Sequence, residues 1–290
     1  MLSQTRALVP SVRTCLLITT YNWPEALRLT LASVARQTRM PEEIVIADDG
    51  SGPDTRAVID QWRGRGLPIE HVWQEDVGFR VARSRNSAIA CTRADYIVSI
   101  DGDMVLHPRF IEDHVNAARP DWFIQGARPR LSPETTAKLL QHGVPRVSLF
   151  ARGMQQRPYA LRSTLLSKLM SRTKTTVVGI QGCNQSFWRE HAVRVNGYDE
   201  RFNNWGPEDR EFAARLLHIG LQRRQLRHLA IAFHLYHPTR APLEKNPLNR
   251  LLEETLSKRA VWAEHGLDAH LRARAASIAQ PVTRDARSGQ

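Results

Sequence analysis

The feature that most constrains this chain is a regular alternation of short apolar runs and amphipathic segments in its first half. Runs of strand length occur at residues 15–19, 44–47, 69–73 and 96–100, and all but 69–73 are mostly apolar. The segments between them carry apolar residues at helical spacing, and the first begins at Pro24, a residue suited to the first turn of a helix. Strands that alternate with helices form mostly parallel sheets covered on both faces. The sequence therefore predicts an α/β fold with a mostly parallel central sheet flanked by helices.

Polar clusters follow three of these runs, at the point where each predicted strand ends. They read Thr19-Thr20-Tyr21-Asn22, Asp48-Asp49-Gly50-Ser51 and Asp101-Gly102-Asp103. Ligands of such sheets bind at the carboxyl ends of the strands. Asp101 and Asp103 can face one ion, and carboxylate oxygens favour Mg²⁺ or Mn²⁺. Asp and Gly also form turns for local reasons, but acids at two neighbouring strand ends repel each other unless a cation or a hydrogen-bond donor lies there.

The second half of the chain departs from this alternation, within what we expect to be a single domain spanning residues 1–290. The sequence predicts a strand at 177–181, a helix that opens at Pro207 and a final helix at 248–265. We divide the chain into a first half, a basic insertion or lid, a second half and a loose basic tail, at residues 13–127, 128–175, 176–265 and 266–290.

The charge balance predicts anionic partners without choosing among them. A net charge of +12 suits nucleic acid, anionic lipid or a phosphorylated glycan, and also a basic surface without a dedicated partner. The three cysteines show no metal or disulfide spacing, so a reducing compartment fits best. The N-terminus lacks the basic start and apolar run of a signal peptide, and no stretch of about 18 apolar residues could span a membrane. We therefore expect no signal peptide, no membrane span and a cytoplasmic location.

Acids and imidazoles in the second half are further candidates for chemistry. Glu208 and Asp209 lie in the first turn of a predicted helix after Trp205-Gly206-Pro207, and adjacent helical residues point about 100° apart. One acid could accept a proton while the other binds a substrate, or both could simply complement the helix dipole. His234 and His237 follow an apolar run, and a neutral imidazole from either could complete a metal site or be structural.

Aromatic and basic residues near the first strands are candidates for contacts with a nucleotide. Tyr21 or Trp23 could stack on a base or be buried in the turn, and Asp49 could accept hydrogen bonds from a base or a ribose. Arginines at 80, 83 and 85, followed by Asn86, open a predicted helix. Guanidinium groups at a helix N-terminus suit a diphosphate, although they could equally form surface ion pairs.

In their order along the chain, these clusters resemble the family-two glycosyltransferases of the GT-A, Rossmann-like fold. The resemblance is carried first by Leu17 to Asn22, Asp48 to Ser51, Ala82-Arg83-Ser84-Arg85-Asn86 and Asp101-Gly102-Asp103. The second half of the chain resembles the galactosyltransferase-type half of chondroitin-polymerase-like and bacterial surface-glycan enzymes. This resemblance is carried by Gly182 to Phe187, Gly197 to Phe202 and Trp205 to Asp209. The resemblance covers about residues 13–240.

The resemblance implies a UDP-linked nucleotide-sugar donor, bound by the 13–127 half, and an acceptor bound by the 176–265 half. The donor-binding residues would be Thr20, Tyr21, Asn22, Asp49, Arg83, Asn86 and Asp101. The metal ligands would be Asp101 and Asp103, with His234 or the competing His237. Asp209 would be the catalytic base, with Glu208, Trp205 and Gly206 at the acceptor sugar.

The implied function is metal-dependent inverting transfer to a glycan or lipid-linked glycan in the synthesis of bacterial surface polysaccharide or lipopolysaccharide. One base without an enzyme nucleophile implies inversion. We expect no nucleic acid partner, because no zinc, RRM or KH signature is present and acids occupy the strand ends. A nucleotidyltransferase would normally show a Gly-rich phosphate loop with a lysine, which is missing near the first strand. A non-catalytic glycan-binding or nucleotide-sugar-binding protein of the same fold remains the alternative, and the positive charge suggests contact with an anionic membrane face.

Overall fold

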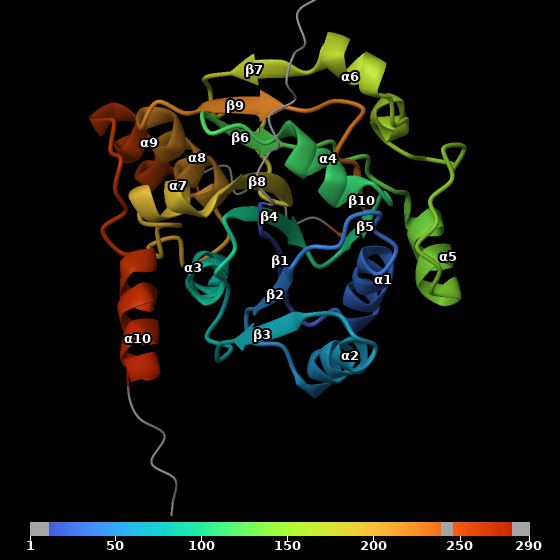
Figure 1. Cartoon of the computed structure of the whole chain (residues 1–290), viewed down its shortest axis with the longest axis horizontal. Coiled ribbons are helices and arrows are strands. Elements are labelled where there is room, and N and C mark those ends of the chain that lie inside the picture. Colours follow the sequence, from blue (N-terminus) through green and yellow to red (C-terminus); the bar gives the residue numbers. More distant parts are fainter. Residues whose placement is uncertain (1–11, 239–245, 280–290) are drawn as a thin grey trace, which may run out of the picture.

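The computed structural model describes residues 12–238 and 246–279, in which an eight-stranded sheet lies between two layers of helices (Figure 1). The sheet order is β3-β2-β1-β4-β8-β6-β9-β7. In chain order the strands are β1 Thr14–Thr20, β2 Glu43–Asp48, β3 Ile69–Trp73, β4 Tyr96–Asp101, β6 Trp122–Gln125, β7 Arg172–Lys174, β8 Asn184–Trp188 and β9 Gln222–Gln225. A two-stranded sheet pairs β5, Met104–Leu106, with β10, Ala232–His234.

The first four strands are parallel to one another, as the alternating pattern predicts. β1 pairs with both β2 and β4, and β2 pairs with β3, all in parallel. Apolar side chains of β1, β2 and β4 are buried on both faces, which is why these strands have continuous apolar runs. The predicted α/β fold with a helix-covered sheet is therefore confirmed.

The helices form one layer on each side of the sheet (Figure 1). One layer contains α1 Pro24–Val34, α2 Pro53–Gly64, α4 Phe110–Ala117 and α5 Pro133–His142. The other contains α3 Val81–Cys91, α7 Arg189–Arg194, α8 Glu208–His218, α9 Asn249–Lys258 and α10 Leu267–Ala279. The short helices η1 Arg157–Ala160 and α6 Thr164–Met170 lie near the β7 end of the sheet.

The second half of the sheet is mixed. β8 is antiparallel to both β4 and β6, whereas β6 and β9 are parallel. The strand predicted at 177–181 is wrong, because that stretch forms turns and the strand lies at β8. β8 lacks the apolar pattern of a buried strand, because its buried residues Asn184 and Ser186 are polar. Their side chains bond the ring of His114 at 3.0 and 2.8 Å.

The basic segment 128–175 is more regular than expected. It forms α5, η1, α6 and β7, and β7 pairs with β9 as the last strand of the sheet. The helix predicted at 248–265 ends at Lys258, where Arg259 adopts the left-handed conformation, φ 49°. No helix within residues 12–238 and 246–279 combines the length and the apolar character needed to cross a membrane.

The segment predicted as a loose tail is a helix over much of its length. Residues 267–279 form α10, which packs against α3. Leu267 is fully buried, and His270 bonds Ser87 of α3 at 3.0 Å. The expectation of a loose tail is therefore wrong for α10, whose few apolar residues suffice because two of them, Leu267 and Leu271, face the core around α3. Residues 280–290 of that prediction lie outside the described part.

Candidate functional site

The carboxyl ends of β1, β2 and β4 bring the predicted acidic clusters to one edge of the sheet. Asp101 ends β4, and the turn that follows is tied to β1 because Gly102 N donates to Thr19 O at 2.7 Å. A Cβ at Gly102 would lie 3.0 Å from Thr20 Oγ1, so the close approach favours glycine. Thr20 itself is buried beneath this turn.

Asp103, His234 and His237 form the cluster in which a metal ion can be held. Their ligand atoms all lie within 4.8 Å of one another. Asp103 Oδ2 is 3.4 Å from His234 Nε2 and 3.3 Å from His237 Nε2. The pairing of β10 with β5 creates this proximity, because it places His234 opposite Met104. The structure thus brings together both histidines between which the sequence could not choose.

The chemistry of this cluster fits a divalent cation. Burial and the neighbouring Asp101 raise the pKa of Asp103 to about 8, and its buried Oδ1 has no hydrogen-bond partner among the described residues. Burial lowers the pKa of His234 to about 3, so its imidazole is neutral and offers a lone pair. A carboxylate with two imidazoles suits a divalent first-row transition-metal ion such as Mn²⁺, and a cation would satisfy the unpaired oxygen. Asp101 lies outside the group of three.

Asp49 is held rigidly at the end of β2. Its Oδ2 accepts from Arg80 N at 2.8 Å and its Oδ1 from the Gln74 side chain at 2.5 Å, while burial raises its pKa. Tyr21 lies in the same neighbourhood, 53% exposed, and its hydroxyl donates to Asp76 Oδ2 at 2.9 Å.

Asn22 and Trp23 follow β1 near this edge. Asn22 has φ 44°, and its Oδ1 accepts from Gly52 N at 2.9 Å, so it joins the loops after β1 and β2. Trp23, the alternative stacking residue, is partly buried edge-on to His237, with ring centroids 6.1 Å apart.

Trp73 is a candidate that the sequence reasoning missed. It ends β3 opposite Asp48, is 53% exposed, and its indole N–H donates to Ser51 O at 3.0 Å. The sequence could have pointed to Trp73, because it is the last residue of a predicted strand. The three polar clusters were chosen because they follow the ends of neighbouring strands.

Arg85 is the basic residue of α3 that reaches the site, and sequence reasoning assigned that role to Arg83. The Arg85 guanidinium bonds Glu208 Oε1 at 3.0 Å and Asp101 Oδ1 at 3.3 Å, and it lies over the ring of Tyr198. It is 4% exposed. These contacts make one buried cation the link between the end of β4 and the start of α8.

The structure does not place Arg83 and Asn86 as expected. Residues two apart on a helix point about 200° apart, so Arg83 faces away from Arg85 and pairs with Glu200 at 3.4 Å. Asn86 is fully buried, and its amide bonds the backbone N–H and carbonyl of Tyr198 and the Glu200 carboxylate. We correct the prediction for Asn86: it holds the loop before α8 and is closed to a ligand.

The first turn of α8 presents the two acids differently. Asp209 Oδ2 accepts from Gly182 N at 2.7 Å, an approach that a Cβ at Gly182, 3.2 Å from the Asp209 Cβ, would crowd. Burial raises the pKa of Asp209, and burial with the adjacent Asp209 raises that of Glu208 to about 7. Asp209 is partly exposed and its pKa lies above its ordinary value. Such a carboxylate can accept a proton from a hydroxyl near neutral pH.

Trp205 and Gly206 lie at the entrance to α8. Trp205 is 40% exposed, and its carbonyl accepts from Asn246 Nδ2 at 2.8 Å. Gly206 lies against Leu248, where a Cβ would be 3.0 Å from the leucine Cδ1. An exposed indole just before the helix that carries Glu208 and Asp209 is suited to the apolar face of a sugar ring.

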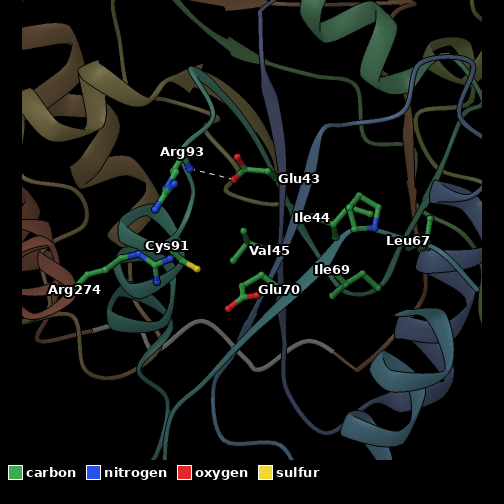
Figure 2. A pocket seen from close by; sticks show the side chains of 10 residues that line it. Glu43, Ile44, Val45, Leu67, Ile69, Glu70, Cys91, Arg93 and Arg274 are labelled. Carbon is green, nitrogen blue, oxygen red and sulfur yellow. Dashed lines mark hydrogen bonds between the residues drawn. The ribbon is translucent and has the colours of Figure 1, made fainter. Parts of the chain in front are cut away.

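A cavity of about 450 Å³ lies at the opposite edge of the sheet and contains none of these residues (Figure 2). It is lined by the amino ends of β2 and β3, with Arg93 and Arg274 reaching in from the end of α3 and from α10. The candidate site lies instead at the carboxyl ends of the strands, where Arg85 links Asp101 at the end of β4 to Glu208 in the first turn of α8.

Comparison with known proteins finds a family model and several relatives that match most of this chain. The model of the glycosyl transferase family 2 matches residues 15–250. Hyaluronan synthase of Pasteurella multocida is 28% identical over 222 residues, which are 71% of this chain and 23% of that protein. Validoxylamine A glucosyltransferase of Streptomyces hygroscopicus subsp. limoneus is 31% identical over 211 residues, 69% of this chain and 46% of that protein. The chain thus spans about a quarter to a half of the length of these relatives.

Solved structures share the fold. The structure of S. aureus TarS 1–349 in complex with UDP-GlcNAc superposes with a TM-score of 0.61 at 13% identity and covers 89% of this chain and 69% of that one. The complex of the same protein with UDP gives 0.59 at 14% identity and covers 89% and 68%. At this identity the match supports the GT-A fold.

Proposed function

Because this chain belongs to glycosyltransferase family 2, we propose that it transfers a sugar from a nucleotide-sugar, UDP-linked, to a hydroxyl of a glycan or lipid-linked glycan, with Mn²⁺ or Mg²⁺ at the donor. The arrangement that carries the proposal is the Arg85 guanidinium between Asp101 and Glu208, next to Asp209. It joins a donor end and an acceptor end in one site. A metal-dependent transferase needs both, whereas a non-catalytic binding protein needs no base.

At the donor end, Asp49 and Tyr21 are the groups proposed to contact the nucleoside. The Asp49 carboxylate is fixed by Arg80 N and Gln74, so it presents a defined acceptor to a base or a ribose hydroxyl. The Tyr21 ring is exposed beside it, and Trp73 offers a second stacking surface. TarS carries UDP or UDP-GlcNAc in the similar fold, which supports a UDP-linked donor for this chain.

Asp103, His234 and His237 would hold the metal, with Asp101 proposed nearer to the ribose and the metal. A bound divalent cation would supply positive charge to the departing diphosphate. Arg85 holds Asp101 in place at that end.

At the acceptor end, Asp209 takes the proton from the attacking hydroxyl. The hydrogen bond from Gly182 N orients Asp209 Oδ2. The hydroxyl oxygen then forms a bond to the anomeric carbon as the bond to the diphosphate oxygen breaks on the opposite side. Direct attack inverts the configuration. Glu208, fixed by Arg85, and Trp205 with Gly206 bind the acceptor sugar.

The biological setting is proposed from the relatives. Hyaluronan synthase of P. multocida and chondroitin synthase of Escherichia coli, the latter 24% identical over 239 residues, carry glycan polymers in their names. We place this chain in the synthesis of a bacterial surface polysaccharide or lipopolysaccharide. A cytoplasmic location, at the inner face of the membrane, is the expectation that fits such acceptors.

Labelled nucleotide-sugars test the proposal. The protein is incubated with Mn²⁺ and a panel of UDP-, GDP- and dTDP-sugars, and release of the free nucleotide is followed with and without candidate glycans. We expect release from a UDP-sugar that Mn²⁺ stimulates and EDTA abolishes. Binding of glycans or nucleotide-sugars without turnover under all these conditions would instead identify a binding protein.

A further inference from the structure

The helix α6 exposes two leucines and buries a polar side chain. Leu165 and Leu169, one helical turn apart, are 67% and 70% exposed. Ser167, by contrast, is buried and its hydroxyl bonds that of Ser171 at 2.9 Å. Because it costs free energy to leave two leucines of one helical face in water, an apolar partner is expected to cover them.

The segment around α6 also lacks acids. No Asp or Glu occurs between Glu134 and Glu190, whereas Lys and Arg recur through this stretch. Lys168 and Arg172 are exposed beside the leucines, and Arg172 begins β7, the edge strand that lies next to α6 in Figure 1. We call Leu165, Lys168, Leu169 and Arg172 the α6 surface.

We propose that the α6 surface docks on an anionic lipid bilayer. Its positive charge is complementary to the headgroups, and its leucines have the length to enter the boundary between headgroups and acyl chains. A phosphorylated glycan or nucleic acid would account for the charge and leave the leucines in water. The observations therefore favour lipid.

Docking through α6 would use no residue of the candidate site. Asp103, His234, Arg85 and Asp209 belong to β4, β10, α3 and α8 or their ends, and none belongs to the α6 surface. Residues from 128 onward lead from the site to α6, since Arg130 pairs with Gln155 and bridges to His234. The segment thus connects the catalytic edge to the bilayer, and docking does not require transfer.

Vesicle sedimentation of the full chain tests the proposal. Vesicles of phosphatidylcholine alone are compared with vesicles that also contain phosphatidylglycerol, at low and high salt, without donor or acceptor. We expect binding to the anionic vesicles that salt weakens. Lys168→Gln with Arg172→Gln should lower the partition coefficient roughly 30-fold, because each basic residue near such a surface contributes about fivefold. Arg36→Gln with Arg56→Gln, which removes the same charge elsewhere, should change it far less.

The leucines are tested by Leu165→Ser with Leu169→Ser, which keeps the charge. We expect a loss of vesicle binding together with unchanged circular dichroism and unchanged release of nucleotide from a sugar donor. A dye on Leu165→Cys should shift to the blue on anionic vesicles, and a dye on Arg56→Cys should not; the three native cysteines are buried.

Three results would overturn the proposal. The first is no binding to anionic vesicles, and the second is equal binding by all variants. The third is a concentration-dependent dimer that Leu165→Ser with Leu169→Ser abolishes, because a second copy of the chain would then cover the α6 surface. None of them bears on glycosyl transfer, so the two proposals fail separately.

Discussion

Arg85 illustrates what determines a site at the scale of single residues. Sequence motifs locate the acids, because Asp101, Asp103 and Asp209 stand at strand and helix ends. They do not tell which of two arginines on α3 faces them. Arg85 is buried between Asp101 and Glu208, whereas Arg83 is half exposed beside Glu200.

Arg85→Lys should lower kcat/KM on the order of 100-fold. A lysine retains the charge but offers no planar pair of donors to two carboxylates, and a displacement of about 1 Å costs that much in rate. Arg83→Lys is the matched control and should change kcat/KM little. Equal losses in both variants, measured in the nucleotide-release assay, would contradict the role assigned to Arg85.

The rate of transfer should fall as the pH decreases through a pKa above the ordinary range of an aspartate. Burial raises the pKa of Asp209, so its protonated, inactive form persists to higher pH than for a free carboxyl. Activity is therefore present above this pKa and lost below it. Glu208, whose pKa is raised to about 7, would broaden the profile. A kcat/KM that stays constant down to the ordinary pKa of an aspartate would argue against Asp209 as the base.

Metal binding should stabilise the folded chain. A ligand at 100 times its Kd adds about 2.7 kcal/mol, a shift of several degrees in Tm. We expect Mn²⁺ to raise the Tm, EDTA to reverse it, and Asp103→Asn or His234→Ala to remove the shift. His218→Ala, on α8, should keep it. A shift that persists in Asp103→Asn would place the ion elsewhere.

At the scale of elements, α10 shows where patterns in the sequence mislead. Its composition is basic and Ala-rich, with weak periodicity, and predicts a loose tail. The tertiary contacts of Leu267, His270 and Leu271 with the region of α3 are what order it. β8 was missed for the converse reason. Three of its buried residues, Asn184, Gln185 and Ser186, are polar, and Asn184 and Ser186 bond the ring of His114.

Leu267→Ala should destabilise the protein by about 2–5 kcal/mol, since the side chain is fully buried and its removal leaves a cavity. Ile278→Ala, on the same helix but 65% exposed, should change the free energy of unfolding by less than about 0.5 kcal/mol. Urea unfolding of both variants measures the difference. Equal, small effects would mean that α10 is not docked.

At the scale of the whole molecule, the sequence predicted the parallel strands β1 to β4 and placed Asp49 and Asp101 at or just after their carboxyl ends. It could do so because parallel strands impose continuous apolar runs and end at a common edge. It could not predict that β10 brings both His234 and His237 to Asp103, since this depends on strand pairing between residues far apart in sequence. The α6 surface likewise cannot be predicted from sequence, because only the structure shows that its leucines are exposed and not part of the core.

The division into a donor end and an acceptor end is the central claim, and Asp209 is the residue on which it depends. The most direct measurement is transfer by Asp209→Asn, together with the anomeric configuration of the wild-type product by NMR. Glu253→Gln, an exposed acid on α9, is the control. We predict an inverted product and a loss in kcat of about 10²–10⁴-fold in Asp209→Asn, with UDP still bound. A retained configuration, or near-wild-type transfer by Asp209→Asn, would contradict the account.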